Sequence, residues 1–374
     1  MAPSVKPAVD VEWDAFPLEL RRDIDRYLEG LTRVRRSRTG QRIRPLKSST
    51  IRTRRAELQA AARMAVKNGV PVGKLDTLSA MLAPAVAEMV LDAYWKKNGD
   101  NPRLFTIDLA CRFLAIAKET KCLTDTDCER LDEMRRDLED LRQGGLTDKN
   151  IAFLRQVLSP GVWSRIVRLP FAMMAEAGRH RHAPVRAAVI AQVAVAIAIE
   201  SVAPVRIANL TAIRLDTNLI KPGGPNSNYW LTFPDHDVKN RVKLNYPLGQ
   251  GVTKLIDEYV YNFRPTLLRG RNEDFLFPGQ RQGSKDEVSF SGQITKRIYK
   301  ATGLRMTVHQ FRHAAGALIL KHRPGEYELV RQLLGHRNVQ TTINSYIGLE
   351  TIQASEIFSK IVEAHMEGNL DADE

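Results

Sequence analysis

Apolar residues recur at helical spacing through the first half of the chain. Between residues 46 and 165 they return every three or four positions, as on one face of an α-helix. The stretches are Leu58, Ala62, Ala65 and Val66, then Leu78, Leu82, Val86, Met89 and Val90, then Ile107, Cys111, Leu114 and Ile116. Glycine and proline separate them, as expected where helices end. The pattern predicts a small all-helical domain over residues 46–165.

The pattern changes in the second half of the chain. Residues 166–184 contain a polar break and are expected to form a linker. A helical run from Val185 to Val202 follows, and two short runs, 229–233 and 242–246, then flank a polar turn. Their β-branched and aromatic residues are typical of a β-hairpin. Because helical patterns resume beyond it, the sequence predicts a second domain over residues 185–350 and a fold that is mainly α with a small β-sheet.

Two helices near the end of this second domain carry clear boundary signals. Thr307 and Gln310 have the spacing of a capping box, in which two residues at a helix N-terminus satisfy backbone N–H groups. A second helix starts near Tyr327 and is expected to end at Gly335, because glycine readily adopts the left-handed conformation that follows a helix. A short polar segment then begins at Thr341.

The two ends of the chain differ in composition. Residues 1–45 are assigned to an N-terminal extension with a basic arm, since residues 33–55 hold ten Lys or Arg and no acidic residue. Such a run is either a solvated arm or one that docks on phosphates, and we favour the second interpretation. Residues 351–374 are assigned to a C-terminal amphipathic helix and an acidic tail.

The overall charge narrows the class of partner. The net charge is +13 and the isoelectric point is about 9.7, which favours a polyanion. No run of eighteen apolar residues suggests a membrane span, and acidic residues near the N-terminus do not fit a signal peptide. We therefore expect a soluble cytoplasmic protein, associated with the nucleoid, whose polyanion is DNA.

Cysteine and histidine patterns do not indicate a metal site or a disulfide framework. Cys111, Cys122 and Cys128 are odd in number and lack C-x-x-C spacing. His180 and His182 form an H-x-H pair without a nearby cysteine or acidic partner, which disfavours a metal role. We expect neither a metal ion nor a cofactor.

The residues with the clearest candidate chemistry lie between Thr307 and Tyr346. His309 and Arg312 stand three positions apart, on one face of the predicted helix, so both can reach a single phosphate. The triplet Leu-Gly-His that ends at His336 follows, and then Tyr346. This order of H-x-x-R, L-G-H and tyrosine resembles the C-terminal motifs of the tyrosine site-specific recombinases, the phage integrase family.

Two upstream segments are similar to further motifs of that family. The segment from Ala203 to Leu210 resembles the one that carries the first catalytic arginine, here Arg206, with Asn209 where an acid is often found. The family's hairpin lysine would be Lys239, with Lys243 as the alternative. The resemblance thus implies six catalytic residues, Arg206, Lys239, His309, Arg312, His336 and Tyr346.

These residue types suit strand cleavage by a tyrosine. Arginine binds two phosphate oxygens at once and keeps its charge, which fits Arg206 and Arg312. A phenol has an ordinary pKa of about 10 and must lose its proton, which His309 would accept while His336 binds the phosphate. The hairpin lysine would protonate the leaving 5′-oxygen. The product would be a 3′-phosphotyrosine open to attack by another 5′-hydroxyl, without ATP or a metal ion.

The resemblance also implies partners. The substrate would be double-stranded DNA, as for a mobile genetic element, with the domain over residues 46–165 as the core-binding domain that clamps the duplex. The protein would act as a homo-oligomer, a tetramer on paired DNA sites, with accessory DNA-bending or directionality factors. The C-terminal helix would pack either on its own domain or on a neighbouring subunit. Two other functions stay open: strand cleavage like that of a type IB topoisomerase, and site-specific DNA binding without catalysis.

Overall fold

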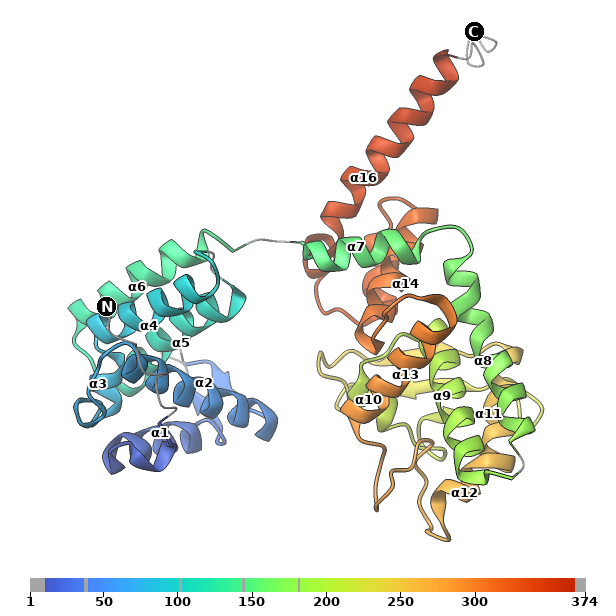
Figure 1. Ribbon diagram of the computed structural model, residues 1–374, viewed down its shortest axis with the longest axis horizontal. Coiled ribbons are helices and arrows are strands. Elements are labelled where there is room, and N and C mark those ends of the chain that lie inside the picture. The colour runs from blue at the N-terminus through green and yellow to red at the C-terminus, as the bar shows by residue number, and fades with distance from the viewer. Residues whose placement is uncertain (1–10, 37–39, 101–102, 143–144, 181, 367–374) are drawn as a thin grey trace, which may run out of the picture. The chain divides into compact units, whose positions relative to one another are not determined.

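The structure is a computed structural model that describes residues 11–36, 40–100, 103–142, 145–180 and 182–366. The chain separates into two compact units, Met1–Gln143 and Gly144–Glu374. Each unit has its own hydrophobic core and is described by itself. The first runs from blue to green in Figure 1 and the second from green to red.

Unit 1, Met1–Gln143, consists of helices and one small hairpin. Its elements are η1 (Trp13–Ala15), α1 (Leu18–Gly30), β1 (Arg35–Arg36), β2 (Arg42–Ile43), α2 (Ser48–Lys67), η2 (Val72–Lys74), α3 (Leu78–Leu82), α4 (Pro84–Lys97), α5 (Leu104–Thr120) and α6 (Asp125–Glu139). The two strands pair in antiparallel fashion. Helices dominate this unit, as the apolar periodicity predicted.

The first helix, α1, corrects the prediction of an N-terminal extension over residues 1–45. Its buried residues Leu20, Ile24 and Leu28 repeat every four positions and join the same core as Leu58 of α2. A helix that places such an apolar face in the core is part of the unit. The described part of this segment is therefore folded into unit 1.

The basic window of residues 33–55 is also partly folded onto unit 1. Arg35 lies in β1 and pairs with Glu119 at 2.9 Å, and Arg55 in α2 pairs with Asp25. Some of the positive charge of this window is therefore neutralised by acidic residues of unit 1. Residues 37–39 of the window lie outside the described part of the chain. The described part of the window forms strands β1 and β2 and the start of α2. The favoured interpretation, docking on phosphates, stays a prediction.

Unit 2, Gly144–Glu374, packs helices and a small sheet around one core. Its helices are α7 (Asp148–Val157), α8 (Val162–Arg179), α9 (Pro184–Val202), α10 (Ile207–Thr211), α11 (Gln250–Glu258), the π-helix η3 (Tyr259–Phe263), α12 (Arg264–Leu268), α13 (Glu287–Thr302), α14 (Val308–His322), α15 (Tyr327–Leu334) and α16 (Val339–Met366). Strands β3 (Leu219–Ile220), β4 (Trp230–Phe233) and β5 (Leu244–Pro247) form an antiparallel sheet in that order. The predicted fold class, mainly α with a small β-sheet, is confirmed.

The central element of this core is α9. Every residue from Ile190 to Glu200 is buried. Among the helices that the structure describes, α9 alone is long and apolar enough to cross a membrane, but 72% of its apolar window is buried inside unit 2. Packing within the unit therefore accounts for its apolar sequence.

The boundary between the units lies at residue 143, upstream of the predicted end at residue 165. Both α7 and α8 belong to unit 2, where Ile166, Met173 and Met174 of α8 join the core around α9. Residues 166–184 are thus mostly helical and do not form a linker, and Pro170 lies inside α8. Apolar periodicity in the sequence shows that a helix has an apolar face. It does not show which of the two hydrophobic cores that face packs against, so α7 and α8 were assigned to the wrong domain or to a linker.

The predicted hairpin is formed by β4 and β5, with Leu231 opposite Tyr246. The second strand begins at Leu244, two residues later than expected, because its pairing with β4 starts there, where Leu244 lies opposite Phe233. Lys243 therefore lies with Lys239 in the connecting loop, residues 234–243, and not inside a strand.

The boundary signals of α14 and α15 are confirmed. The Thr307 N–H donates a hydrogen bond to Gln310 Oε1 at 2.8 Å, which is one half of a capping box. Gly335 ends α15 with a φ of +59°, and a Cβ at this position would lie 2.6 Å from Leu244 Cδ2. Glycine is therefore favoured there by its backbone conformation, and a larger residue would also have to displace the Leu244 side chain.

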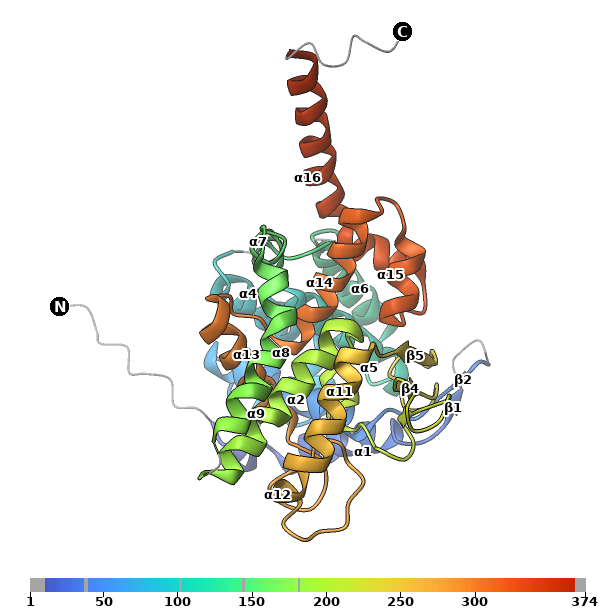
Figure 2. The ribbon, with the colours of Figure 1, turned by 90° about the vertical axis from the view of Figure 1, so that its right-hand side faces the viewer.

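The last helix, α16, corrects the predicted end of the chain. It begins at Val339, includes Tyr346 and continues to Met366, so no separate polar segment precedes the C-terminal helix. In both views its far end extends away from α14 and α15 (Figure 2). The predicted acidic tail, residues 367–374, lies outside the described residues.

Candidate active site

Arg312 links the segments of the candidate site. It lies in the second turn of α14 with only 4% of its surface exposed. One terminal nitrogen donates to the Pro204 carbonyl at 2.6 Å, and the other donates to the Leu334 carbonyl at 2.5 Å. Pro204 lies two positions before Arg206, and Leu334 lies two positions before His336. The guanidinium group thus holds two other candidate residues near its own helix.

Arg206 brings a second guanidinium group close to the first. It is the N-cap residue of α10 and is half-buried. Burial lowers its pKa, and the charge of Arg312 lowers it further. Its side chain has no hydrogen-bond partner within the described part of the chain. Because two like charges are costly to hold together without an anion between them, this arrangement favours a bound phosphate.

His336 is held by a buried threonine of the last helix. Its Nδ1 lies 2.9 Å from the hydroxyl oxygen of Thr342, which is fully buried in α16. Burial and the charges of Arg312 and Arg206 lower the pKa of His336 to about 4. The imidazole is therefore neutral at neutral pH. When the threonine hydroxyl donates to Nδ1, the proton of His336 is on Nε2 and can reach a phosphate oxygen.

His309 faces the same two arginines from the first turn of α14. Partial burial lowers its pKa, and the charges of Arg312 and Arg206 lower it further. Its ring meets that of His313 edge to face, with 4.9 Å between the centroids. A neutral imidazole at this position is able to accept a proton near neutral pH.

The Tyr346 side chain packs against the backbone of α14, and its hydroxyl group points into the protein. Only 1% of its surface is exposed, and its O–H donates to the backbone carbonyl of Arg312 at 3.0 Å. Burial raises the pKa of this phenol. The ring rests against Gly316, one helical turn beyond Arg312, where a Cβ would lie 2.3 Å from the hydroxyl oxygen. In this arrangement the phenol is protonated and unable to attack a phosphate.

We expect Gly316→Ala to destabilise the protein by displacing Tyr346. The added methyl group overlaps the ring, and such overpacking costs about 1 to 3 kcal/mol. In a Tyr346→Ala background the overlap is absent, and the same substitution should stabilise α14 by about 1 kcal/mol through helix propensity. Urea unfolding of the four proteins measures both effects. An equal effect of Gly316→Ala in both backgrounds would show that the glycine does not make room for the phenol.

Lys239 is exposed in the hairpin loop, and among the described residues no hydrogen bond or ion pair joins it to any of the other five candidates. The loop itself is attached to the site. The amide of Asn240 donates to the Gly335 carbonyl at 2.9 Å, and the Tyr246 hydroxyl donates to the Leu333 carbonyl at 2.6 Å. Lys239 therefore lies in a loop that is hydrogen-bonded, through its neighbour Asn240, to the residue before His336.

Several residues with clear structural roles at this site were not identified from the sequence. Asn240 and Tyr246 attach the hairpin to the end of α15, Thr342 holds His336, and Gly316 makes room for Tyr346. Asn209, buried where the family often has an acid, donates to the Asp237 carbonyl at 3.4 Å. Except for the contact between His336 and Thr342, which are six residues apart, these contacts join distant segments, so no spacing in the sequence signals them.

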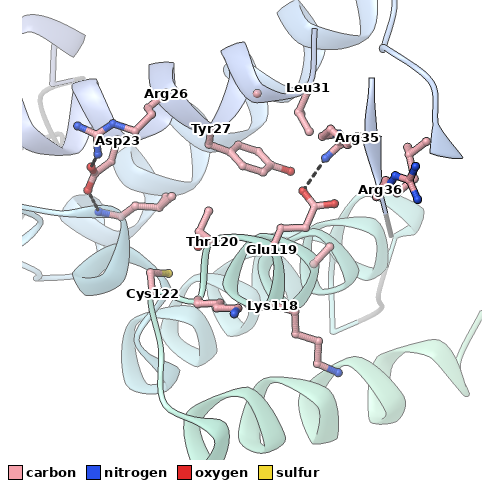
Figure 3. A pocket seen from close by; sticks show the side chains of 15 residues that line it. Asp23, Arg26, Tyr27, Leu31, Arg35, Arg36, Lys118, Glu119, Thr120 and Cys122 are labelled. Atoms are coloured by element: carbon pink, nitrogen blue, oxygen red, sulfur yellow. Dashed lines mark hydrogen bonds and ion pairs between the residues drawn. The ribbon is translucent and has the colours of Figure 1, made fainter. Parts of the chain in front are cut away.

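Unit 1 contains a separate basic hollow of about 780 Å³ (Figure 3). Five basic residues line it: Arg26, Arg35, Arg36, Lys118 and Lys121. Two acidic residues, Asp23 and Glu119, line it as well and pair with Arg26 and Arg35. It shares no residue with the candidate active site. No group of three His, Cys, Asp or Glu residues that could hold a metal ion occurs in the part of the chain that the structure describes.

Comparison with known proteins gives one family match. The family described as the phage integrase family matches residues 191–351. The tyrosine recombinase XerD of Yersinia pestis is 31% identical over 111 residues, which cover 29% of this chain and 36% of that protein. XerD of Proteus mirabilis is 28% identical over 111 residues, with 29% and 35% covered. The chain thus spans roughly a third of the length of these relatives.

Two solved structures are similar over most of the chain. A lambda integrase (75-356) dimer bound to a COC′ core site has 16% identity and a TM-score of 0.48, and the match covers 87% of this chain and 94% of that one. The XerH site-specific recombinase bound to a difH substrate has 16% identity and a TM-score of 0.43, with 88% and 94% covered.

Proposed function

Because this chain belongs to the phage integrase family of tyrosine recombinases, we propose that it is a site-specific recombinase that cleaves and rejoins double-stranded DNA. The observation that carries this proposal is the convergence of four side chains in unit 2. Arg206, Arg312, His309 and His336 come from three segments, and the charges of both arginines act on both histidines. Two guanidinium groups and two neutral imidazoles form a site suited to a phosphodiester.

The proposed reaction assigns one role to each residue. Arg206 and Arg312 bind the non-bridging oxygens of the phosphate, and His336 donates a further hydrogen bond. His309 accepts the proton of the Tyr346 phenol as its oxygen attacks phosphorus. The bond from phosphorus to the 5′-oxygen breaks, and Lys239 gives that oxygen a proton. A 3′-phosphotyrosine remains, and attack by a 5′-hydroxyl of another strand reverses each transfer.

Two movements are needed before this reaction. Tyr346 must leave the Arg312 carbonyl and Gly316, where its hydroxyl faces away from solvent. Lys239 must approach the phosphate, which the exposed position of its loop permits. We propose that DNA binding drives both movements, so that the free protein does not cleave.

The proposed partners follow from charge and from the family. The substrate is double-stranded DNA, and the net charge of +13 together with the basic hollow of unit 1 supports phosphate binding by both units. We further propose a homo-oligomer, a tetramer on paired sites, with accessory DNA-bending or directionality factors. The protein would act in the cytoplasm, at the nucleoid.

The test of this function begins by selecting tightly bound duplexes from a random DNA library. The selected site is then prepared with a nick that lets the cleaved strand diffuse away, so that a covalent complex accumulates and is seen on a denaturing gel. We expect an adduct on the selected site and none on a scrambled duplex. Relaxation of supercoiled plasmids of any sequence would favour the topoisomerase alternative. Tight binding of the selected site without an adduct would favour a non-catalytic DNA-binding protein.

A further inference from the structure

One hydrogen bond joins the residue after Lys239 to the residue before His336. Asn240, which follows the lysine, donates its side-chain amide to the carbonyl of Gly335 at 2.9 Å. Asparagine is common in turns, where its side chain usually bonds to the backbone a few residues away. Here the partner lies 95 positions along the chain. The roles assigned in the proposed reaction do not account for this contact.

Lys239 lies in a turn that is anchored on both sides. The Arg241 N–H donates to the Val238 carbonyl at 3.0 Å, so Lys239 and Asn240 are the two central residues of a β-turn. Val238, on one side of the lysine, is 1% exposed and belongs to the core of unit 2. On the other side, Asn240 is bonded to Gly335. The backbone of Lys239 is therefore held in place, while its side chain is exposed.

The acceptor of this hydrogen bond is also held in place. A helix leaves its last carbonyls without partners inside the helix, and α15 ends at Leu334. Three successive carbonyls at this end accept from side chains of other segments: Leu333 from Tyr246 at 2.6 Å, Leu334 from Arg312 at 2.5 Å, and Gly335 from Asn240 at 2.9 Å. These donors belong to β5, α14 and the hairpin loop. The peptide that precedes His336 is thus a fixed point for the turn of Lys239.

We infer that Asn240 is a positioning residue for Lys239, and that its hydrogen bond to Gly335 sets where the lysine backbone lies relative to a phosphate bound beside His336. The inference rests on the proposed function, because it requires that Lys239 protonates the leaving 5′-oxygen. With the turn in place, the lysine reaches the phosphate by rotation of its four-carbon side chain. The ammonium group must come within hydrogen-bond reach of the 5′-oxygen to transfer a proton.

The test measures single-turnover cleavage of the selected, nicked site in two chemical forms. One form has the ordinary 5′-oxygen at the scissile phosphate, and the other has a sulfur atom in its place. A thiol has a pKa of about 8.5, far below that of an alcohol, so the 5′-sulfur leaves as a thiolate without a proton from the protein. Cleavage of the sulfur form therefore does not depend on the general acid. Both forms depend on the phosphate-binding residues and on the fold.

Two substitutions remove the hydrogen bond. Asn240→Ala removes the side chain, and Asn240→Asp keeps its shape but replaces the donor with an acceptor. Both variants should cleave the oxygen form about tenfold to about a hundredfold more slowly than the native protein, since a misplacement of about 1 Å has a cost of this size. Both should cleave the sulfur form at the native rate.

Three further variants complete the design. Lys239→Ala should show the same pattern with a larger loss on the oxygen form. Adding Asn240→Ala to Lys239→Ala should cause no further loss, because the effects of two residues that act through one group do not add. Asn245→Asp, which places the same charge at an exposed position of β5, is the control and should cleave both forms at the native rate.

Equal slowing of both forms by Asn240→Ala would show that the bond supports His336 or the fold, and would overturn the inference. Cleavage of the oxygen form by Asn240→Ala at the native rate or faster would overturn it as well, as would a loss in Lys239→Ala that sulfur does not restore. In each of these cases an adduct formed by the native chain would still support the recombinase function. A native chain that forms no adduct with either form of a tightly bound site would overturn both.

Discussion

Tyr346→Phe should abolish the covalent complex with nicked DNA and leave DNA binding intact. The substitution removes the hydroxyl oxygen that attacks phosphorus and keeps the ring that packs on Gly316. No other described tyrosine combines a place on α16 with contact to the helix of His309 and Arg312. Gel electrophoresis under denaturing conditions measures the adduct, and fluorescence anisotropy measures binding of the same duplex.

The matched control for this experiment is Tyr261→Phe. Tyr261 belongs to the same unit, and 74% of its surface is exposed. Its variant should form the adduct at the native rate. The hydrogen bond from the Tyr346 hydroxyl to the Arg312 carbonyl is also lost in Tyr346→Phe, which should lower the free energy of unfolding by about 1 kcal/mol. An adduct that persists in Tyr346→Phe would mean that another residue is the nucleophile.

Arg206→Gln should slow strand cleavage by about a hundredfold to a thousandfold, the usual cost of removing one group that stabilises transition-state charge. Arg206 is the better target of the two arginines, because Arg312 also holds the Pro204 and Leu334 carbonyls and its loss would disturb the fold. Single-turnover cleavage of the nicked site measures the rate.

The effect of Arg206→Gln on affinity should be much smaller than its effect on rate. One lost phosphate contact reduces the slope of log affinity against log salt by about one. Arg155→Gln, which removes an exposed arginine of α7, serves as the control and should cleave at the native rate. A rate reduction no larger than the loss of affinity would show that Arg206 binds DNA without acting in the reaction.

Local signals in the sequence predicted the helices that carry the site. The capping spacing at Thr307 and Gln310 and the glycine at position 335 act over a few residues, so the start of α14 and the end of α15 were predicted. The hairpin was predicted for the same reason. The structure brings four of the six candidate side chains together, and the Tyr346 hydroxyl donates to the backbone carbonyl of Arg312. The catalytic roles stay predictions for all six: Arg206, Lys239, His309, Arg312, His336 and Tyr346.

The features that were not predicted depend on contacts between distant segments. The apolar face of α1 does not reveal that it packs with α2, and the periodicity of α8 does not reveal that its core is that of α9. The inward position of Tyr346 depends on the backbone of α14, 34 residues away in sequence. Glu200 ends an apolar run and would ordinarily be assigned to the surface. Its burial follows from the packing of α9 on all sides.

The measurement that tests the central claim most directly is the chemical identity of the covalent bond. The adduct trapped on the selected, nicked site would be digested with protease and nuclease, and the joined peptide and nucleotide identified by mass spectrometry. We predict a peptide that contains Tyr346 with its phenolic oxygen bonded to a 3′-phosphate. A bond to another residue, or to a 5′-phosphate, would contradict the proposed mechanism.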